Sequence, residues 1–410
     1  MKINGYLLPI ALLATVSASS RAEDGAPLHF FVGQEVKYDS NYFRLPDGVD
    51  PSAAATGVSN PPRSETLFNT YAGLGFDNTY GRQHLLADLS VTYYAHRTYK
   101  YLDFTGVTGR AAWNWAIGNR WDGTLSYKRE QAPANYSTFT GFRTDSWVYT
   151  RAAADANYWW HSNWSAGVGA ARVTSGYGNS SVEQFRDYDA DIADARITYR
   201  PSSGNEVRLL VRRTDGSYSN VIQSPSGLLA APFTQYDYLS DAKWVLDGHS
   251  RVSGQVGYST VSYTAGAARF RDFAGPTGRL AYDWTPTGKT SFNFLLRRDI
   301  GPEPQDALNA SFVATSAASV TAEWAASSKV SFRGLAQWRQ REPGGETGAV
   351  DSALLNTTQT HTYSVTGNWK PDRRLSLGAT VGRETRTGDN PVYPNFDDYT
   401  VSGKVEFLFR

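Results

Sequence analysis

Closely spaced histidine, cysteine and acidic side chains are the usual carriers of metal binding and covalent catalysis, and this chain offers few of them. It has no cysteine and six histidines, namely His29, His84, His96, His161, His249 and His361. His84 and His96 share one face of a predicted strand, but they lie twelve residues apart along an extended chain, too far for contact. No HExxH, GxSxG or P-loop pattern occurs. The sequence therefore predicts no enzyme, no bound metal and no cofactor.

Arginine is the other residue type in this chain whose side chain could bind a solute. A guanidinium group can bind a carboxylate through two parallel hydrogen bonds and can also bind pairs of hydroxyl groups. On the polar face of the predicted strands, basic side chains moderately outnumber acidic ones. The candidates for contact with a solute are Arg110, Arg151, Arg208, Arg212, Arg297, Arg333 and Arg339. The alternative is that these arginines pair with nearby Asp and Glu residues and only stabilise the wall that carries them.

Eight short turns, spaced 38 to 46 residues apart, organise the segments that position these arginines. The turns are centred near Gly81, Asn119, Ser162, Ser203, His249, Thr287, Ser328 and Asp372. Between successive turns lie two segments of alternating polarity, joined by a longer stretch rich in Gly, Pro, Ser and Asn. A tight turn, a strand, a long loop and a returning strand, repeated along the chain, are typical of an outer-membrane β-barrel.

The alternation is clearest from residue 83 to residue 97. Leu89 and Val91 fall on one face, while Asp88 and Thr92 fall on the other. Since alternate residues of a strand point to opposite sides, one face suits lipid and the other suits water. A soluble β-sandwich or propeller would alternate too. The predicted strands, however, are much longer than the five or six residues typical of soluble sheets.

Aromatic residues precede most of the short turns. Trp115, Trp160, Tyr199, Trp244, Trp284, Trp324 and Trp369 stand one to three residues before a turn. Trp and Tyr have one apolar and one polar end, and they accumulate at membrane interfaces. We therefore expect these seven residues to form an aromatic girdle at one membrane boundary. Aromatic residues of the long loops, among them Tyr99, Tyr136 and Phe142, could stack on sugar rings or simply mark the other boundary.

The predicted fold class is all-β: a transmembrane, antiparallel, up-and-down β-barrel with short periplasmic turns and long extracellular loops. Counting the segments gives about eighteen strands, with both termini on the short-turn side. Sixteen is the second choice, because the pattern from Asp187 to Ala195 is irregular and suggests a bulge. Barrels of this size are wide enough for an aqueous channel. Residues 219–235 are a candidate constriction loop within it.

Residues 1–22 have the features of a cleaved secretory signal peptide. Lys2 gives the positive start, 6–16 the apolar stretch, and Ser20-Arg21-Ala22 the cleavage site. The barrel would then cover residues 23–410. Cleavage changes the formal net charge from +1 to −1, and neither value suggests a nucleic-acid partner. No later segment has the apolar length of a transmembrane helix, so the pattern favours export to the outer membrane of a Gram-negative cell.

The segment 36–48 contains Asp39-x-Asn41-x-x-Arg44-Leu45 at the end of the first predicted strand. This segment, and the runs 71–77 and 82–85, resemble the opening of EpsL-like proteins. These are outer-membrane components of exopolysaccharide loci associated with exosortase systems in Gram-negative bacteria. The resemblance implies a part in exporting a secreted polysaccharide. It carries over no catalytic residue.

Three functions are open on the sequence. The first, which the resemblance favours, is an outer-membrane channel that passes a hydrated exopolysaccharide through an Arg-rich lumen. Its partners would be outer-membrane lipid, the polysaccharide, the barrel assembly machinery and periplasmic or inner-membrane export components. The second is a general or sugar-selective uptake porin. The third is a non-conducting structural or adhesive barrel at the cell surface.

Overall fold

The computed structural model describes residues 27–409, except 134–135, 137–140, 143–145, 179–186, 202–203, 220–221, 225–226, 230–231, 265–271, 303–311, 346–355 and 391–392. The predicted signal peptide lies outside the described residues. Among those residues, no helix is long and apolar enough to cross a bilayer.

The described chain is almost entirely β-strand. The long strands are β1 (Leu28–Asp39), β2 (Glu65–Tyr80), β3 (Gln83–His96), β4 (Phe104–Ile117), β5 (Trp121–Pro133), β6 (Ser146–His161), β7 (Trp164–Tyr177), β8 (Tyr188–Tyr199), β9 (Glu206–Tyr218), β12 (Phe233–Val245), β13 (Ser250–Tyr263), β14 (Phe273–Thr287), β15 (Thr290–Gly301), β16 (Phe312–Trp324), β17 (Val330–Gly344), β18 (Thr358–Trp369), β19 (Leu375–Gly388) and β20 (Phe396–Phe409).

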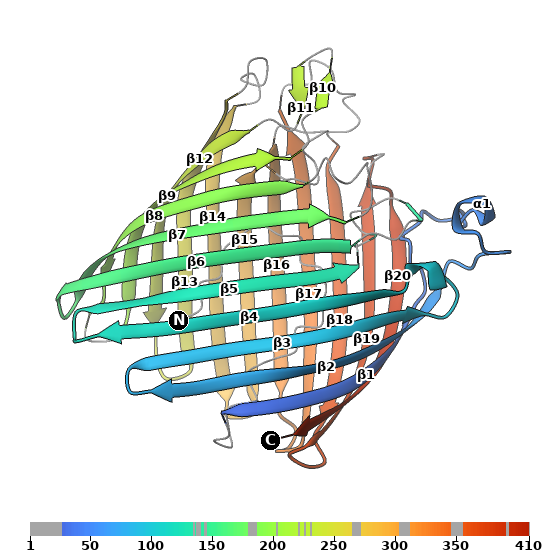
Figure 1. The fold of residues 1–410 in the computed structure, drawn as a ribbon, viewed down its shortest axis with the longest axis horizontal. Helices are drawn as coiled ribbons and strands as arrows, with labels where there is room; N and C mark the ends of the chain where they lie inside the picture. The colour runs from blue at the N-terminus through green and yellow to red at the C-terminus, as the bar shows by residue number, and fades with distance from the viewer. Residues whose placement is uncertain are drawn as a thin grey trace.

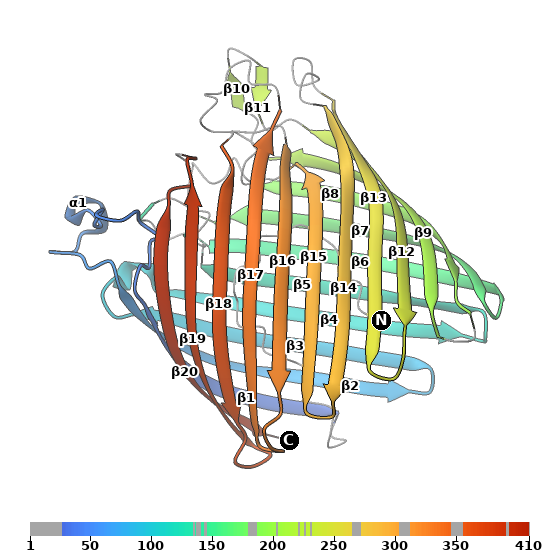
Figure 2. The same cartoon turned by 180° about the vertical axis from the view of Figure 1, so that it is seen from behind.

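These strands form one closed sheet of 18 strands. Each strand pairs antiparallel with the next along the chain, and β9 is followed by β12. β1 also pairs with β20, from Phe30 opposite Phe409 to Asp39 opposite Thr400, so the sheet closes on itself. Figure 1 shows the wall of β2–β9 in front of the more upright strands of the opposite wall, and Figure 2 shows the barrel from behind. The predicted up-and-down barrel of the outer-membrane type is confirmed with eighteen strands, and the second choice of sixteen is wrong.

The connections alternate between short and long, as the sequence predicts. The short ones are 81–82, 118–120, 162–163, 200–205, 246–249, 288–289, 325–329 and 370–374. Two of the long ones, 40–64 and 97–103, contain the helix α1 (Ala53–Thr56) and the 3-10 helix η2 (Lys100–Leu102).

The expected constriction segment, 219–235, contains two further short strands. β10 (Ile222–Ser224) and β11 (Gly227–Leu229) pair with each other in a separate two-stranded sheet. Figure 1 shows this hairpin at the long-loop end of the barrel. Most side chains of the segment lie outside the described residues, so a constriction there stays a prediction.

Side chains that reach across an intervening strand identify the concave, lumen-facing side of the sheet. The Tyr71 hydroxyl on β2 donates a hydrogen bond to Glu406 Oε2 on β20 at 3.1 Å, although β1 lies between these strands. A Cβ atom at Gly33 of β1 would lie 2.2 Å from the Tyr71 hydroxyl oxygen, so glycine is needed beneath this contact. Because side chains alternate along a strand, the other side faces outward. Exposed apolar residues such as Leu89 and Val256 lie on it.

The long-loop end of β8 inverts the usual pattern of polar residues inside and apolar residues outside. Ala190 and Ile192 face inward and pack in a buried cluster that includes Val173, whereas Asp191 between them is exposed on the outward side. This inversion explains the irregular sequence pattern. The suspected bulge is absent, because β8 pairs residue for residue with both neighbours over Tyr188–Tyr199.

The predicted girdle residues gather at one end of the barrel. Trp115, Trp160, Tyr199, Trp244, Trp284, Trp324 and Trp369 all lie at the short-turn ends of their strands. All are exposed except Trp115, which is partly buried. Their role at a membrane boundary stays a prediction.

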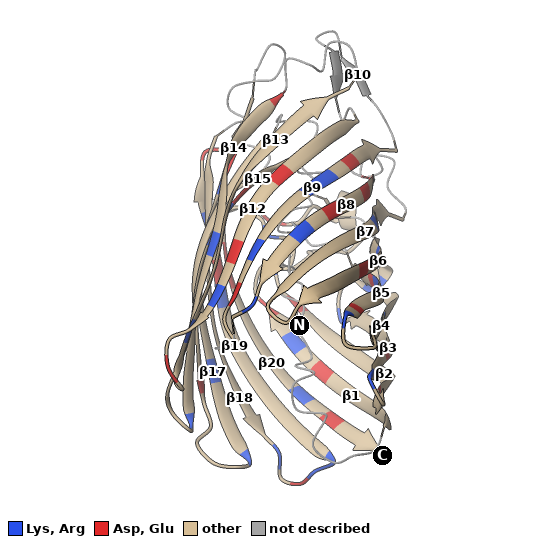
Figure 3. Ribbon diagram, turned by 90° about the vertical axis from the view of Figure 1, so that its left-hand side faces the viewer, with Lys and Arg blue, Asp and Glu red and all other residues tan. Residues whose placement is uncertain are grey.

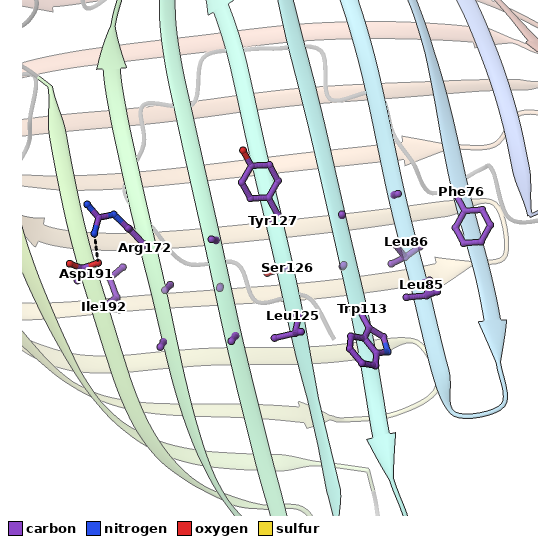
Figure 4. A pocket seen from close by; sticks show the side chains of 18 residues that line it. Phe76, Leu85, Leu86, Trp113, Leu125, Ser126, Tyr127, Arg172, Asp191 and Ile192 are labelled. Atoms are coloured by element: carbon purple, nitrogen blue, oxygen red, sulfur yellow. Dashed lines mark ion pairs between the residues drawn. The ribbon is translucent and has the colours of Figure 1, made fainter.

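Arginines recur on the outward side at a constant distance from the short turns. Arg129, Arg172, Arg298 and Arg383, here called the outward arginine belt, each lie eight residues after the first residue of β5, β7, β15 and β19. Arg172 lies 3.5 Å from Asp191, and Arg383 lies 2.7 Å from Asp397. Figure 4 shows the first pair at the edge of a shallow depression lined largely by alanines and bordered by larger apolar residues. The belt therefore marks where the apolar outer surface becomes polar.

Candidate functional site

A row of charged side chains crosses the lumen-facing side of β3 to β6. Asp88, Arg110, Lys128 and Arg151 occupy directly opposed positions on these four strands. Arg110 Nε donates to Asp88 Oδ2 at 2.5 Å, and Lys128 Nζ lies 2.6 Å from a Glu130 oxygen. The Arg110 and Lys128 side chains are nevertheless 56% and 49% exposed. Since both point into the barrel, this exposure means that the lumen beside them is open to solvent.

A second group of charges, around Arg196 on β8, is buried. Its guanidinium group lies 3.0 Å from Asp155 and 2.9 Å from Asp194, and its Nε donates to Asn157 Oδ1 at 3.0 Å. Arg196 reaches Asp155 and Asn157 of β6 across β7. A Cβ at Gly167 of β7 would lie 2.3 Å from Asn157 Oδ1. The Arg196 side chain is 7% exposed, so this group stabilises the wall and offers little to a solute.

Arg208 and Arg212 lie on β9 and face acids of β12. Arg208 Nε donates to Asp241 Oδ2 at 2.8 Å, while Gln255 donates to the other oxygen of that carboxylate at 2.6 Å. Arg212 lies 3.9 Å from Asp237. Both arginines are much less exposed than Arg110, and their settings resemble that of Arg196.

The other predicted arginines lie on the same inward side in varied settings. Arg297 on β15 contacts Asp299 two residues further along the strand. Arg333 on β17 lies 3.5 Å from Glu323 of β16. Arg339, also on β17, is opposite Ala317 of β16 and Thr360 of β18. The seven candidates, Arg110, Arg151, Arg208, Arg212, Arg297, Arg333 and Arg339, are thus spread around the wall rather than gathered at one point. Their contact with a solute stays a prediction.

The Asp-x-Asn-x-x-Arg-Leu segment joins β1 to β20 at the long-loop end. Arg44 lies 2.8 Å from Asp39 and 3.0 Å from Asp398 of β20. Asn41 Nδ2 donates to the Leu45 carbonyl oxygen at 2.8 Å, and the Leu45 N–H donates to Asn41 Oδ1 at 2.9 Å. Arg44 has a φ of 56°, and its side chain is 11% exposed. These residues form a buried ion cluster, here called the seam cluster, that ties the first strand to the last.

Aromatic residues of three long loops pack together near the seam cluster. Phe43, Tyr99 and Leu102 form a buried core, against which Tyr136 and Phe142 pack. The Phe43 ring centroid lies 4.8 Å from that of Tyr99 and 4.8 Å from that of Phe142. Because these rings contact one another edge to face, they act in loop packing, and stacking of Tyr99, Tyr136 and Phe142 on sugars has no support here.

The histidines form no catalytic or metal-binding group among the described residues. His96 Nδ1 lies 3.2 Å from Asp103, and its Nε2 shares a 2.7 Å hydrogen bond with the Tyr42 hydroxyl inside the loop packing. His84 lies 2.7 Å from Asp77. In the part of the chain that the structure describes, no three His, Cys, Asp or Glu residues could hold a metal ion. The lack of enzymatic activity stays a prediction.

The closed sheet, the apolar outer surface and the charged lumen define a β-barrel of the outer-membrane class. No protein-family profile and no curated protein sequence matches the chain. The resemblance to EpsL-like proteins therefore stays a prediction.

Several solved barrels are similar to the chain at low identity. The outer-membrane protein OpdK from Pseudomonas aeruginosa is 10% identical, with a TM-score of 0.49 over 93% of this chain and 99% of that one. A BenF-like porin from Pseudomonas fluorescens Pf-5 is 10% identical, with a TM-score of 0.48 over 94% and 99%. OccAB3 from Acinetobacter baumannii is 10% identical, with a TM-score of 0.47 over 93% and 99%. The class of this chain rests on its own strand pairing.

Proposed function

We propose that the chain is an outer-membrane channel that admits small hydrated solutes, as a general or sugar-selective porin does. One observation carries this proposal: Arg110 and Lys128 are about half exposed although they point into the barrel from the middle of their strands. A barrel of 18 strands is wide enough to hold an aqueous passage. Diffusion through such a passage requires no moving part and no cofactor.

The outer surface supports a location in the outer membrane. Its apolar band lies between the aromatic girdle and the outward arginine belt. The belt lies six to eight residues beyond the positions opposite Trp115, Trp284, Trp324 and Trp369. With a rise of about 3.4 Å per residue and a tilt of about 45°, six to eight residues cover about 14–19 Å of depth. This depth is most of the apolar band of about 25 Å that outer-membrane barrels present.

Solutes that carry several hydroxyl or carboxylate groups suit this wall. Arg110 and Lys128 each lie beside a carboxylate, so a passing solute meets donors and acceptors in close succession. The neighbouring acids also weaken any single contact with a base. Conduction needs binding of this kind, favourable enough for entry and weak enough for release.

Export of an exopolysaccharide, with polysaccharide and export components as partners, is the second candidate. Its support is the resemblance of segment 36–48 to EpsL-like proteins. Asp39, Asn41 and Arg44 of that segment serve the seam cluster, which is a structural task. A polymer would also need a continuous track of exposed groups, and buried charges such as Arg196 interrupt the described wall. These points favour small solutes.

Conductance in planar bilayers tests the proposal. We expect steady channels whose preference for anions falls severalfold in the variant Arg110→Gln/Lys128→Gln, because Asp88 and Glu130 then dominate the row. The matched control Arg129→Gln/Arg172→Gln removes two outward charges and should leave ion selectivity unchanged. A folded barrel that never conducts would contradict the proposal and favour the structural or adhesive alternative.

A deletion strain separates uptake from export. Slower entry of small sugars or organic acids, with normal release of extracellular polysaccharide, is the expected outcome. Polysaccharide trapped in the periplasm with normal small-solute entry would instead support the export channel.

A further inference from the structure

The eight short turns place a ring of basic residues at one end of the barrel. Six of the turns carry lysine or arginine, namely Arg82, Arg120, Arg200, Lys289, Lys329, Lys370, Arg373 and Arg374. Of the other two turns, one directly follows His161 and the other ends with His249. Asp247 and Asp372 are the only acids within these turns. Figure 3 shows basic positions in blue at several of the lower turns. We call the eight Lys and Arg residues the basic rim.

Hydrogen bonds position several of these charges without neutralising them. Arg82 donates to the Gly118 carbonyl oxygen and, at 2.8 Å, to Asn119 Oδ1 in the next turn. Lys329 Nζ donates to the Pro371 carbonyl oxygen at 2.7 Å, again in the next turn. These acceptors carry no net charge, so the cations keep their attraction for an external anion. Arg200 differs, because it pairs with Glu206.

The two acids of the turns have a local task. Asp247 Oδ1 accepts a hydrogen bond from the His249 N–H at 2.7 Å. Asp372 Oδ1 accepts bonds from the N–H groups of Arg374 and Leu375 at 2.6 and 2.9 Å. These two backbone bonds hold the pKa of Asp372 below its usual value. Both carboxylates fix the shape of their turns, and Asp372 also attracts the charges of Arg374 and Lys329. Two acids still leave the eight Lys and Arg residues of the basic rim with a clear excess of positive charge.

The position of the basic rim relative to the aromatic girdle points to its partner. Lys289 follows Trp284 by five residues, and Lys370 directly follows Trp369. Exposed Trp residues at the end of an apolar band lie at the level of lipid headgroups, so cations just beyond them lie at the level of phosphate. The charges come from turns all around the barrel, which fits a shell of lipid better than a protein bound on one side.

We propose that the basic rim binds the phosphate groups of anionic phospholipids in the membrane leaflet on the short-turn side. The chemistry required is a negatively charged glycerophosphate headgroup of the phosphatidylglycerol type. Charge complementarity supplies the attraction, and the ring of turns supplies many weak sites rather than one pocket. This inference is independent of what passes through the lumen.

Quenching of tryptophan fluorescence by brominated lipids tests the proposal. The full barrel is reconstituted in phosphatidylcholine vesicles that contain brominated phosphatidylglycerol or brominated phosphatidylethanolamine. Exposed Trp284 and Trp369 report lipid in contact with the rim. We expect phosphatidylglycerol to bind severalfold more tightly at low salt. The preference should shrink at high salt, because exposed charges are then screened.

Two variants with the same change in charge locate the effect. Lys289→Gln/Lys370→Gln/Arg374→Gln removes three exposed rim charges and should abolish most of the preference. Arg97→Gln/Lys100→Gln/Arg129→Gln removes three charges at or beyond the opposite boundary and should retain it. Resistance to unfolding in SDS checks that each barrel is folded. If the triple rim variant does not fold, the single variant Lys370→Gln replaces it.

Three outcomes would overturn the proposal. The first is equal quenching by both brominated lipids with the wild-type barrel. The second is a preference that survives in the rim variant. The third is a rim variant that binds lipid as the wild type does but no longer binds an acidic periplasmic protein. That result would make the rim a protein-docking surface.

Discussion

The two rims of the barrel are built by different means, although the same strands enter both. The short-turn rim consists of connections of two to six residues whose side chains are mostly exposed. The long-loop rim contains a buried aromatic core around Phe43 and the buried seam cluster around Arg44. Strand pairing and hydrogen bonds at the surface therefore shape the first rim, whereas buried side-chain packing shapes the second.

The charged residues of the two rims also differ, because those of the seam cluster at the long-loop rim are buried and paired whereas those of the short-turn rim are mostly exposed. Arg44 at the long-loop rim has two carboxylate partners within 3.0 Å. Lys329 at the short-turn rim donates to a neutral carbonyl oxygen. Charge at the first site stabilises the protein internally, and charge at the second remains available to the surroundings. Substitutions should accordingly affect stability at the long-loop rim much more than at the short-turn rim.

Arg44→Ala should have the largest effect. It leaves Asp398 buried without its cation and Asp39 with Lys37 alone, and breaking a buried ion pair costs about 3–5 kcal/mol. The measurement is the temperature at which the barrel loses its resistance to SDS, compared with Arg129→Ala on the outer surface. Arg44→Ala/Asp398→Asn should recover part of the loss. Equal unfolding temperatures for the wild type and Arg44→Ala would show that the seam cluster is dispensable.

Phe43→Ala should have a smaller and more local effect. It removes the ring that Tyr99 and Phe142 contact, and loss of a buried Phe costs about 3 kcal/mol. We expect faster protease cleavage in the long loops while the strands stay protected. Phe407→Ala, on the outer surface near the short turns, is the control and should leave loop cleavage unchanged. Loss of the whole barrel would mean that the two rims are not independent.

Gly118→Ala should have the smallest effect. Gly118 has a φ of 57°, and a Cβ there would contact nothing within 4 Å, so only backbone strain of about 1 kcal/mol is added. Gly403→Ala is the matched control, since its Cβ also meets nothing and its φ is ordinary. The unfolding temperatures of the two variants in SDS should differ slightly. A large loss for Gly118→Ala would contradict the view that the short-turn rim tolerates change.

The strand order and the short turns could be predicted because they depend on local patterns. Alternating polarity predicted the strands of the barrel, and its clearest departure is at β8, where Ile192 faces the lumen and Asp191 faces outward. That inversion depends on a neighbour, Val173 of β7, whose position the pattern of β8 cannot reveal.

The partners of the charged residues were harder to predict. Arg196 meets Asp155 because the wall is concave and Gly167 leaves room between them. The signal was present as two inward-facing glycines, Gly167 and Gly169, on the strand between the partners. The packing of Phe43 with Tyr99 was not predictable, since it joins loops whose relative positions follow only from the closed barrel.

The outward arginine belt restricts which bilayers suit this protein. A hydrocarbon core of about 30 Å, as in a typical membrane, exceeds the depth of the apolar wall below the belt. Acyl chains beside the barrel must then shorten or tilt, or else meet guanidinium groups. Such hydrophobic mismatch favours membranes with thin hydrocarbon cores and drives clustering in thick ones. The position of the arginine belt along the strands would thus help to sort the folded protein between membranes of different thickness.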